Sequence, residues 1–161
     1  MANADETADR EEVLGLYDDQ DRELVATIIR SKDRSLNRVE EIIAFAQAAG
    51  VARIGVAYCR GLAAEAENLR EMLDAHFQVT MVDCKVHGLD NADLVEDASG
   101  AACNPVGQAK VLGDADTQLN IALGLCLGHD MLFAKHSRAP VTTLGVKDRV
   151  LGNDPLAVLR G

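Results

Sequence analysis

The hydrophobic and polar positions of the chain follow helical spacing up to residue 50 and then change to short apolar runs. Near residue 21 a helical pattern begins that places Leu24 and Ile28 on one face. A second helical pattern follows, with Ser35 or Asn37 as its cap and Gly50 after its end. Both patterns are typical of amphipathic helices, so the chain is predicted to begin its ordered part with two helices.

The segment before these helices differs from them in pattern and charge. Residues 1–17 lack apolar periodicity and carry many acidic side chains. Segments of this kind bury too little apolar surface to order themselves. We therefore predict a mobile acidic N-terminus over 1–17 and a single domain over 18–161.

Beyond residue 50, short apolar runs rich in Val, Ile and Leu alternate with helical patterns. The four runs are predicted strands, at 52–59, 77–84, 119–126 and 141–146. Gly61 opens a helix between the first two strands, and such a strand–helix–strand unit has parallel strands and a right-handed crossover. Further helices are predicted at 105–112 and 129–136, and residues 85–104 as a long functional loop.

The alternation of strands and helices predicts the fold class. It indicates an α/β protein, a single three-layer domain with a mostly parallel sheet of about four strands, Rossmann-like and preceded by N-terminal helices. With three Phe, two Tyr and no Trp, the core must be built from Ala, Val, Leu and Ile.

Charge and hydropathy exclude several classes of protein. The chain has 26 acidic and 16 basic residues, a net charge of −10, and no basic stripe of the kind that binds a nucleic-acid backbone. No window reaches the ~18 apolar residues of a membrane helix. The acidic start is unlike a signal peptide. We therefore expect a cytoplasmic protein whose partner is a small molecule or a metal, with neither nucleic acid nor membrane, and whose oligomeric state the sequence leaves open.

The four cysteines fall at special positions in the predicted fold. Cys59, Cys84 and Cys126 each end a predicted strand, and Cys103 stands just before a helix. Carboxyl ends of parallel strands share one edge of the sheet, where ligands bind, and neighbouring strands lie only ~4.8 Å apart. Cytosolic cysteines are reduced, and thiolate sets bind zinc or iron–sulfur clusters. The leading hypothesis is a zinc or iron site formed by these four cysteines, with His129 of the Cys126-Leu-Gly-His129 motif as an alternative ligand.

A second hypothesis is an enzyme or redox protein that uses Cys103 as its nucleophile. A helix N-terminus favours the thiolate form of a cysteine. In this interpretation His129 acts as general base and Asp130 orients it. The residues expected to bind a small anionic substrate are Asn104, Gln108 and Lys147. Nucleotide binding has less support, because no glycine-rich phosphate loop follows a strand.

Several segments of the chain resemble the domain-of-unknown-function 1847 family, which is described as a family of metal-binding proteins. The most specific feature is Cys-Asn-Pro-x-Gly-Gln followed by Gly-Leu-Cys-x-Gly-His-Asp. The resemblance covers CNPVGQAKVL (103–112), LNIALGLCLGHDMLFAKHS (119–137), APVTTLGVKDRVLGNDPLAVL (139–159), RVEEIIAFAQAAGVARIGVAYC (38–59) and VDCKV (82–86). Relatives often begin with a cysteine-rich segment, whereas the first cysteine here is Cys59, so the four later cysteines are the matching positions.

Overall fold

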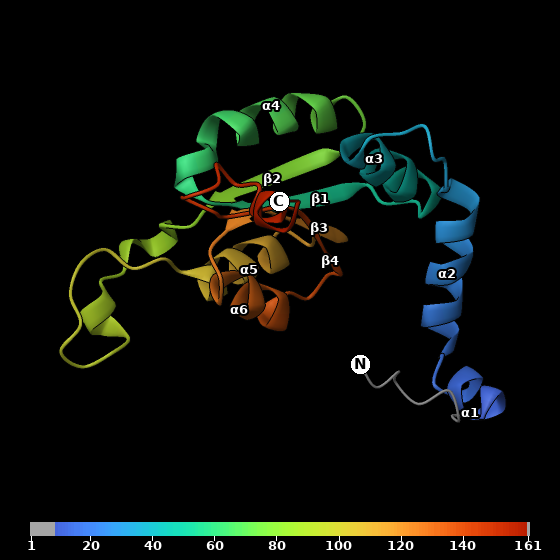
Figure 1. Cartoon of the computed structure of the whole chain (residues 1–161), viewed down its shortest axis with the longest axis horizontal. Helices are drawn as coiled ribbons and strands as arrows, with labels where there is room; N and C mark the ends of the chain where they lie inside the picture. Colours follow the sequence, from blue (N-terminus) through green and yellow to red (C-terminus); the bar gives the residue numbers. More distant parts are fainter. Residues whose placement is uncertain (1–8, 161) are drawn as a thin grey trace. The chain divides into compact units, whose positions relative to one another are not determined.

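The computed structural model describes residues 9–160 and divides into two compact units, residues 1–50 and 51–161. The first unit contains three helices, α1 (Arg10–Gly15), α2 (Asp19–Ser31) and α3 (Arg38–Ala48) (Figure 1). Asp18 and Asn37 form capping boxes at the starts of α2 and α3, which satisfies backbone N–H groups that the helices leave free. Helix α1 lies inside the segment predicted to be a mobile N-terminus, of which residues 1–8 fall outside the described residues.

The second unit is built on a four-stranded, fully parallel sheet, which confirms the predicted α/β class. The strands are β1 (Arg53–Tyr58), β2 (Gln78–Asp83), β3 (Leu119–Leu125) and β4 (Val141–Val146). Their order across the sheet is β2-β1-β3-β4, so β1 and β3 are the central strands. Each of the first three strands ends one residue before a cysteine.

Three helices cover the sheet and make the unit three layers thick. Helix α4 (Ala63–Asp74) lies on one face, and α5 (Pro105–Asp114) and α6 (His129–His136) lie on the other (Figure 1). A buried cluster joins the sheet to α5 and α6 and consists of Ala57, Val82, Ala109, Leu112, Ala122, Leu125 and Phe133. Small and aliphatic side chains dominate this core, as the shortage of aromatic residues predicts.

Strand β3 is buried at every residue, because strands flank it on both sides and helices cover both faces of the sheet. Gly124 in this strand has φ +64°, a left-handed conformation that favours glycine. A Cβ atom there would overlap Cδ1 of Leu62. The pairing of β3 with β4 is irregular at the same place, so Gly124 lets the strand bend just before it reaches Cys126.

A long loop connects β2 to α5 and returns to the place where it started. It contains two short 3-10 turns, η2 (Val86–Gly88) and η3 (Asn91–Asp93), and an isolated antiparallel bridge between Asp90 and Ala101. The backbone N–H of Asn104 then donates to the carbonyl oxygen of Cys84 at 2.8 Å. Two further 3-10 turns lie at Arg60–Leu62 (η1) and Pro155–Leu159 (η4). None of the described helices is long and apolar enough to cross a membrane.

Candidate functional site

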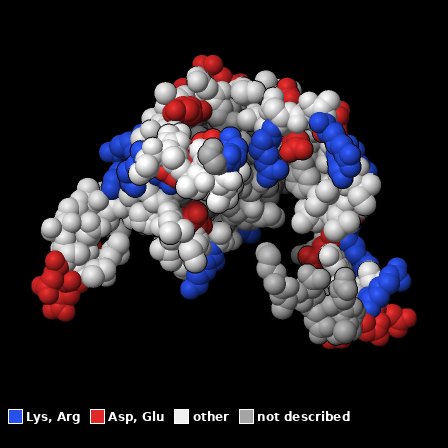
Figure 2. Space-filling view, in the orientation of Figure 1, with Lys and Arg blue, Asp and Glu red and all other residues white. Residues whose placement is uncertain are grey.

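The carboxyl edge of the sheet gathers most of the residues that the sequence singled out. The register pairs Tyr58 with Asp83, so Cys59 and Cys84 leave neighbouring strands side by side. Cys59 stays attached to β3 as well, through its N–H to the carbonyl oxygen of Leu123 at 3.0 Å. Figure 2 shows Lys and Arg side chains gathered over this end of the sheet, near the start of α4, although the chain carries a net charge of −10.

Cys84 lies at the β1–β2 end of this edge and interacts with two other thiols, those of Cys103 and Cys59. Cys84 is buried, with 5% of its surface exposed, and the Cys103 thiol is its neighbour. Burial raises the pKa of Cys84 to about 11, the backbone N–H of Arg60 opposes the rise by donating to Sγ at 3.5 Å, and the neighbouring Cys103 and Cys59 add to it. Cys84 is therefore a neutral thiol at physiological pH, while Cys59 and Cys103 are partly exposed.

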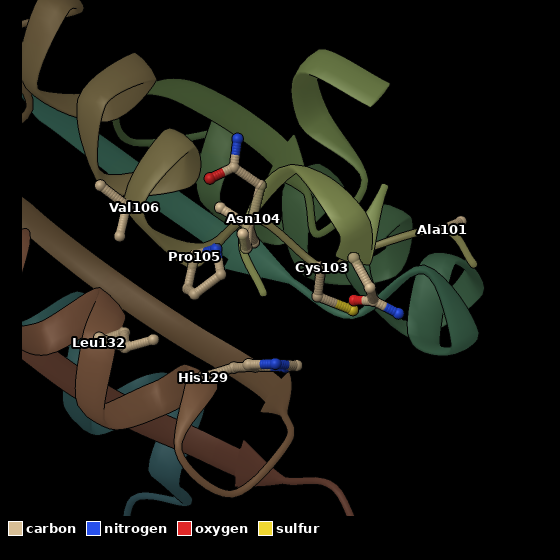
Figure 3. A pocket seen from close by; sticks show the side chains of 9 residues that line it. Ala101, Cys103, Asn104, Pro105, Val106, His129 and Leu132 are labelled. Carbon is tan, nitrogen blue, oxygen red and sulfur yellow. The ribbon is translucent and has the colours of Figure 1, made fainter. Parts of the chain in front are cut away.

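A cavity of about 420 Å³ lies beside this thiol cluster and brings Cys103 together with His129. The two side chains line it from different elements, Cys103 from the long loop and His129 from the start of α6 (Figure 3). The complete lining is Asn91, Leu94, Ala101, Cys103, Asn104, Pro105, Val106, His129 and Leu132. A volume of this size is within the range of small-molecule sites, and the lining combines apolar walls with a few polar groups, as such sites do.

The start of α5 is built to hold Cys103 in place. The Oδ1 atom of Asn104 accepts from the N–H of Gly107 at 2.8 Å and so caps the helix, while its Nδ2 atom donates to the carbonyl oxygen of Val86 at 3.3 Å. Pro105 occupies the first turn, where no backbone donor is needed. The amide predicted to bind substrate thus has both of its polar atoms engaged in anchoring the loop, although Asn104 also lines the cavity.

Gln108 serves the carboxyl edge from below. It is fully buried in α5, and its Nε2 atom donates to the carbonyl oxygens of Tyr58 at 3.2 Å and Val82 at 2.9 Å. These two carbonyls lie near the ends of β1 and β2, just before Cys59 and Cys84. Gln108 therefore ties together the strand ends that carry two thiols, and it is not part of the cavity lining.

The remaining predicted residues lie at the β3–β4 end of the edge. Cys126 lies against Arg149, whose guanidinium donates to Sγ at 3.5 Å. Lys147 follows β4, and its ammonium lies near the turn after β1. The carboxylate of Asp130 accepts from the N–H of Met131 at 2.8 Å, and no hydrogen bond from it to His129 is present among residues 9–160.

The residues at this edge include the predicted metal ligands. Within residues 9–160, no group of three or more His, Cys, Asp or Glu side chains is arranged to hold a metal ion. The arrangement closest to the predicted ligand set is the cluster of Cys59, Cys84 and Cys103. Within the described residues, Cys126 and His129 do not join these thiols in a metal-binding group.

Comparison with known proteins identifies the family. The model of the family described as protein of unknown function DUF1847 matches residues 2–144. The chain belongs to this family. The uncharacterized protein MJ0455 of Methanocaldococcus jannaschii is 47% identical over 122 residues, which are 73% of this chain and 63% of that relative. The chain thus matches less than two thirds of the relative's length. No solved structure matches the DUF1847 chain.

Two basic residues at this edge have roles that sequence reasoning did not assign. Arg149 contacts the Cys126 thiol, and Arg60 both donates a backbone hydrogen bond to Cys84 and pairs through its side chain with Asp83 at 3.2 Å. Arg60 directly follows Cys59, so its closeness to the edge was visible in the sequence. The contact between Arg149 and Cys126 spans 23 residues and left no local signal.

Proposed function

We propose that this protein carries out thiol-dependent chemistry on a small molecule bound in the cavity, with Cys103 as the reacting group. The observation that carries the proposal is that Cys103 and His129, from two distant segments, line one cavity of about 420 Å³ at the carboxyl edge of the sheet. A thiol beside an imidazole is the pairing that activates a cysteine nucleophile.

The proposed roles follow from the positions of the groups. The Cys103 sulfur adds to the electrophilic carbon of a polarised double bond in the substrate, its S–H proton passes to His129, and the π electron pair moves onto the atom bonded to that carbon. Cys84, held neutral by burial, is the thiol neighbour of the Cys103 sulfur. Leu94, Pro105 and Leu132 provide apolar walls for the substrate. Asp130 has no role in this scheme, and Gln108 acts by positioning the strand ends. A cytosolic location would keep the thiols reduced.

Limited alkylation with iodoacetamide near neutral pH, mapped by mass spectrometry, tests this function. Cys103 should label faster than the other three cysteines, and His129→Ala should slow its labelling about tenfold, a modest share of what general-base catalysis contributes. His136→Ala, at the other end of α6, is the matched control and should leave the rate unchanged. Equal labelling of Cys59 and Cys103, or equal effects of the two histidine variants, would remove Cys103 from the role of nucleophile.

We propose metal binding as the second candidate function, because three thiols already interact in one cluster. Cys59, Cys84 and Cys103 would hold zinc or an iron–sulfur cluster, with Cys126 or His129 as a further ligand. Elemental analysis and an absorption spectrum of anaerobically purified protein test this candidate. Metal content should fall in Cys126→Ser and persist in His76→Ala, whose imidazole lies past the end of α4. Metal-free wild-type protein, or equal metal content in wild type and Cys126→Ser, would count against ligation by this set.

A further inference from the structure

The strand order creates a second place on the carboxyl edge where a ligand can bind. The chain leaves β1 toward α4 on one face of the sheet, and it leaves the neighbouring β3 toward α6 on the other face (Figure 1). Loops that depart to opposite faces open a crevice between two adjacent strand ends, which is where open α/β sheets bind ligands. Cys59 and Cys126 are the first residues after these two strands. Neither Cys59 nor Cys126 lines the cavity that contains Cys103.

Lys147 lies at this crevice without a counter-charge. Its side chain is half-buried, and its ammonium makes no ion pair and no side-chain hydrogen bond within the described part of the chain. A Cβ atom added to Gly61 would lie 3.2 Å from Nζ of Lys147 and 3.8 Å from Sγ of Cys59. Because Gly61 has no side chain, the Lys147 ammonium can lie next to the first turn after β1.

Two carboxylates at the carboxyl edge already have partners of their own. Asp148, the next residue, accepts from the backbone N–H groups of Val150 and Leu151 at 2.9 Å and 2.8 Å. Asp83, at the end of β2, pairs with Arg60. A half-buried cation without a partner is unexpected in a chain with 26 acidic residues, since many carboxylates are present to neutralise it.

A second cation completes the arrangement. The guanidinium of Arg149 lies at Cys126, at 3.5 Å from its Sγ, and makes no ion pair among residues 9–160. Lys147 is thus associated with the thiol after β1, and Arg149 with the thiol after β3. The two cations come from one short segment after β4, which brings both to the strand ends that flank the crevice.

We propose that Lys147 and Arg149 form a binding site for a small oxyanion, a phosphate or carboxylate group, at the crevice between the ends of β1 and β3. Lysine contributes a point charge, and the arginine fork contributes donors that match a phosphate or carboxylate. The site lies outside the Cys103 cavity, so this inference goes beyond the proposed thiol chemistry and is tested separately from it.

Two alkylating reagents of similar size test the site on the intact protein. Iodoacetate is an anion and iodoacetamide is neutral, so the ratio of their rates at Cys59, resolved by mass spectrometry, reports the local affinity for anions. Lys147→Gln should lower this ratio about fivefold, the equivalent of about 1 kcal/mol for one lost charge interaction. Lys147→Arg should retain it. Lys110→Gln, which removes an exposed lysine of α5, is the matched control and should leave it unchanged.

Competition identifies the anion and gives outcomes that would overturn the proposal. Inorganic phosphate or succinate should protect Cys59 and Cys126 from iodoacetate, and the more effective of the two indicates whether the site prefers phosphate or carboxylate. Protection should disappear in Lys147→Gln. An unchanged ratio in Lys147→Gln would overturn the proposal, and if both reagents slow equally, the lysine acts on the thiol and not on anions. Failure of the Cys103 proposal would leave these readouts at Cys59 and Cys126 intact.

Discussion

The two halves of the carboxyl edge present the same residue type in different surroundings. At the β1–β2 half, Cys84 is buried, and its neighbours are two other thiols, those of Cys103 and Cys59. At the β3–β4 half, Cys126 is partly exposed and lies against the guanidinium of Arg149. Both Cys84 and Cys126 directly follow a strand, and their positions in the sequence pattern are equivalent.

A position at the end of a strand therefore brings a cysteine to the carboxyl edge, but the surroundings of the thiol determine its chemistry. At the β1–β2 half, burial favours the neutral thiol, and the returning loop delivers a second thiol to it. At the β3–β4 half, a cation stands beside the sulfur and solvent reaches it. Four variants test whether the two halves differ in this way, and they follow in order of decreasing expected effect.

Gln108→Ala should have the largest effect and should act on the β1–β2 half alone. It removes two hydrogen bonds that tie Tyr58 to Val82 and leaves a hole in the core, which together cost about 3 kcal/mol of the free energy of unfolding. Urea denaturation measures this loss. Labelling of Cys59 and Cys84 by iodoacetamide should accelerate, because the strand ends that carry them loosen.

Gln118→Ala is the matched control for Gln108→Ala. Gln118 also binds the backbone near β1, accepting from the N–H groups of Ala52 and Arg53, but it does so at the amino edge of the sheet. Its loss should cost about 1 kcal/mol and leave thiol labelling unchanged. Equal acceleration of Cys126 in Gln108→Ala would show that the two halves are not independent.

The raised pKa of Cys84 should appear as a stability change at alkaline pH. The thiol of Cys84 has a pKa of about 11 in the folded protein against an ordinary value of 9.0. The folded state keeps its proton where the unfolded state loses it, so this contribution is fully present below pH 9 and is lost as pH rises toward about 11. The free energy of unfolding should fall by up to about 2 kcal/mol over that range.

Comparison of three proteins isolates this contribution from the other groups that titrate at alkaline pH. Cys84→Ala should show a shallower loss of stability with pH than wild type, whereas Cys126→Ala should keep the wild-type slope. Denaturant titrations at several pH values under reducing conditions measure the slopes. Identical slopes in wild type and Cys84→Ala would mean that Cys84 is not held neutral by burial.

Asn104→Ala should destabilise the start of α5 by about 1 kcal/mol, the usual cost of losing a helix cap. Because Asn104 also anchors the loop to Val86, the rate advantage of Cys103 over Cys59 in alkylation should shrink about threefold, a change of under 1 kcal/mol. Asn37→Ala removes the corresponding cap of α3 and is the control. A similar loss of stability in both variants, with altered Cys103 labelling in both, would contradict a local role for Asn104.

Arg149→Gln should have the smallest effect and should act on the β3–β4 half alone. The side chain is exposed, so the free energy of unfolding should change by less than about 0.5 kcal/mol. Alkylation of Cys126 by iodoacetamide should slow about threefold, because the guanidinium that donates to its sulfur at 3.5 Å is removed. Labelling of Cys103 should stay the same, and a parallel change at Cys103 would link the two halves.

The sequence by itself determined the parts of this protein that depend on local pattern. Short apolar runs predicted the four strands, the strand–helix–strand spacing predicted that they are parallel, and both predictions are confirmed. The same runs placed Cys59, Cys84 and Cys126 at the last residue of three predicted strands, and in the structure each cysteine lies one residue past its strand. The site was therefore predictable as an edge of the sheet.

Only the tertiary structure decided which of these residues meet. The strand order that makes β1 and β3 neighbours, the return of the long loop that brings Cys103 to Cys84, and the approach of His129 to the same cavity join segments far apart in the chain. The two hydrogen bonds of buried Gln108 and the position of the unpaired Lys147 ammonium also depend on such contacts. Local periodicity carries no information about long-range neighbours, and the protonation and charge of a side chain depend on the neighbours that packing gives it.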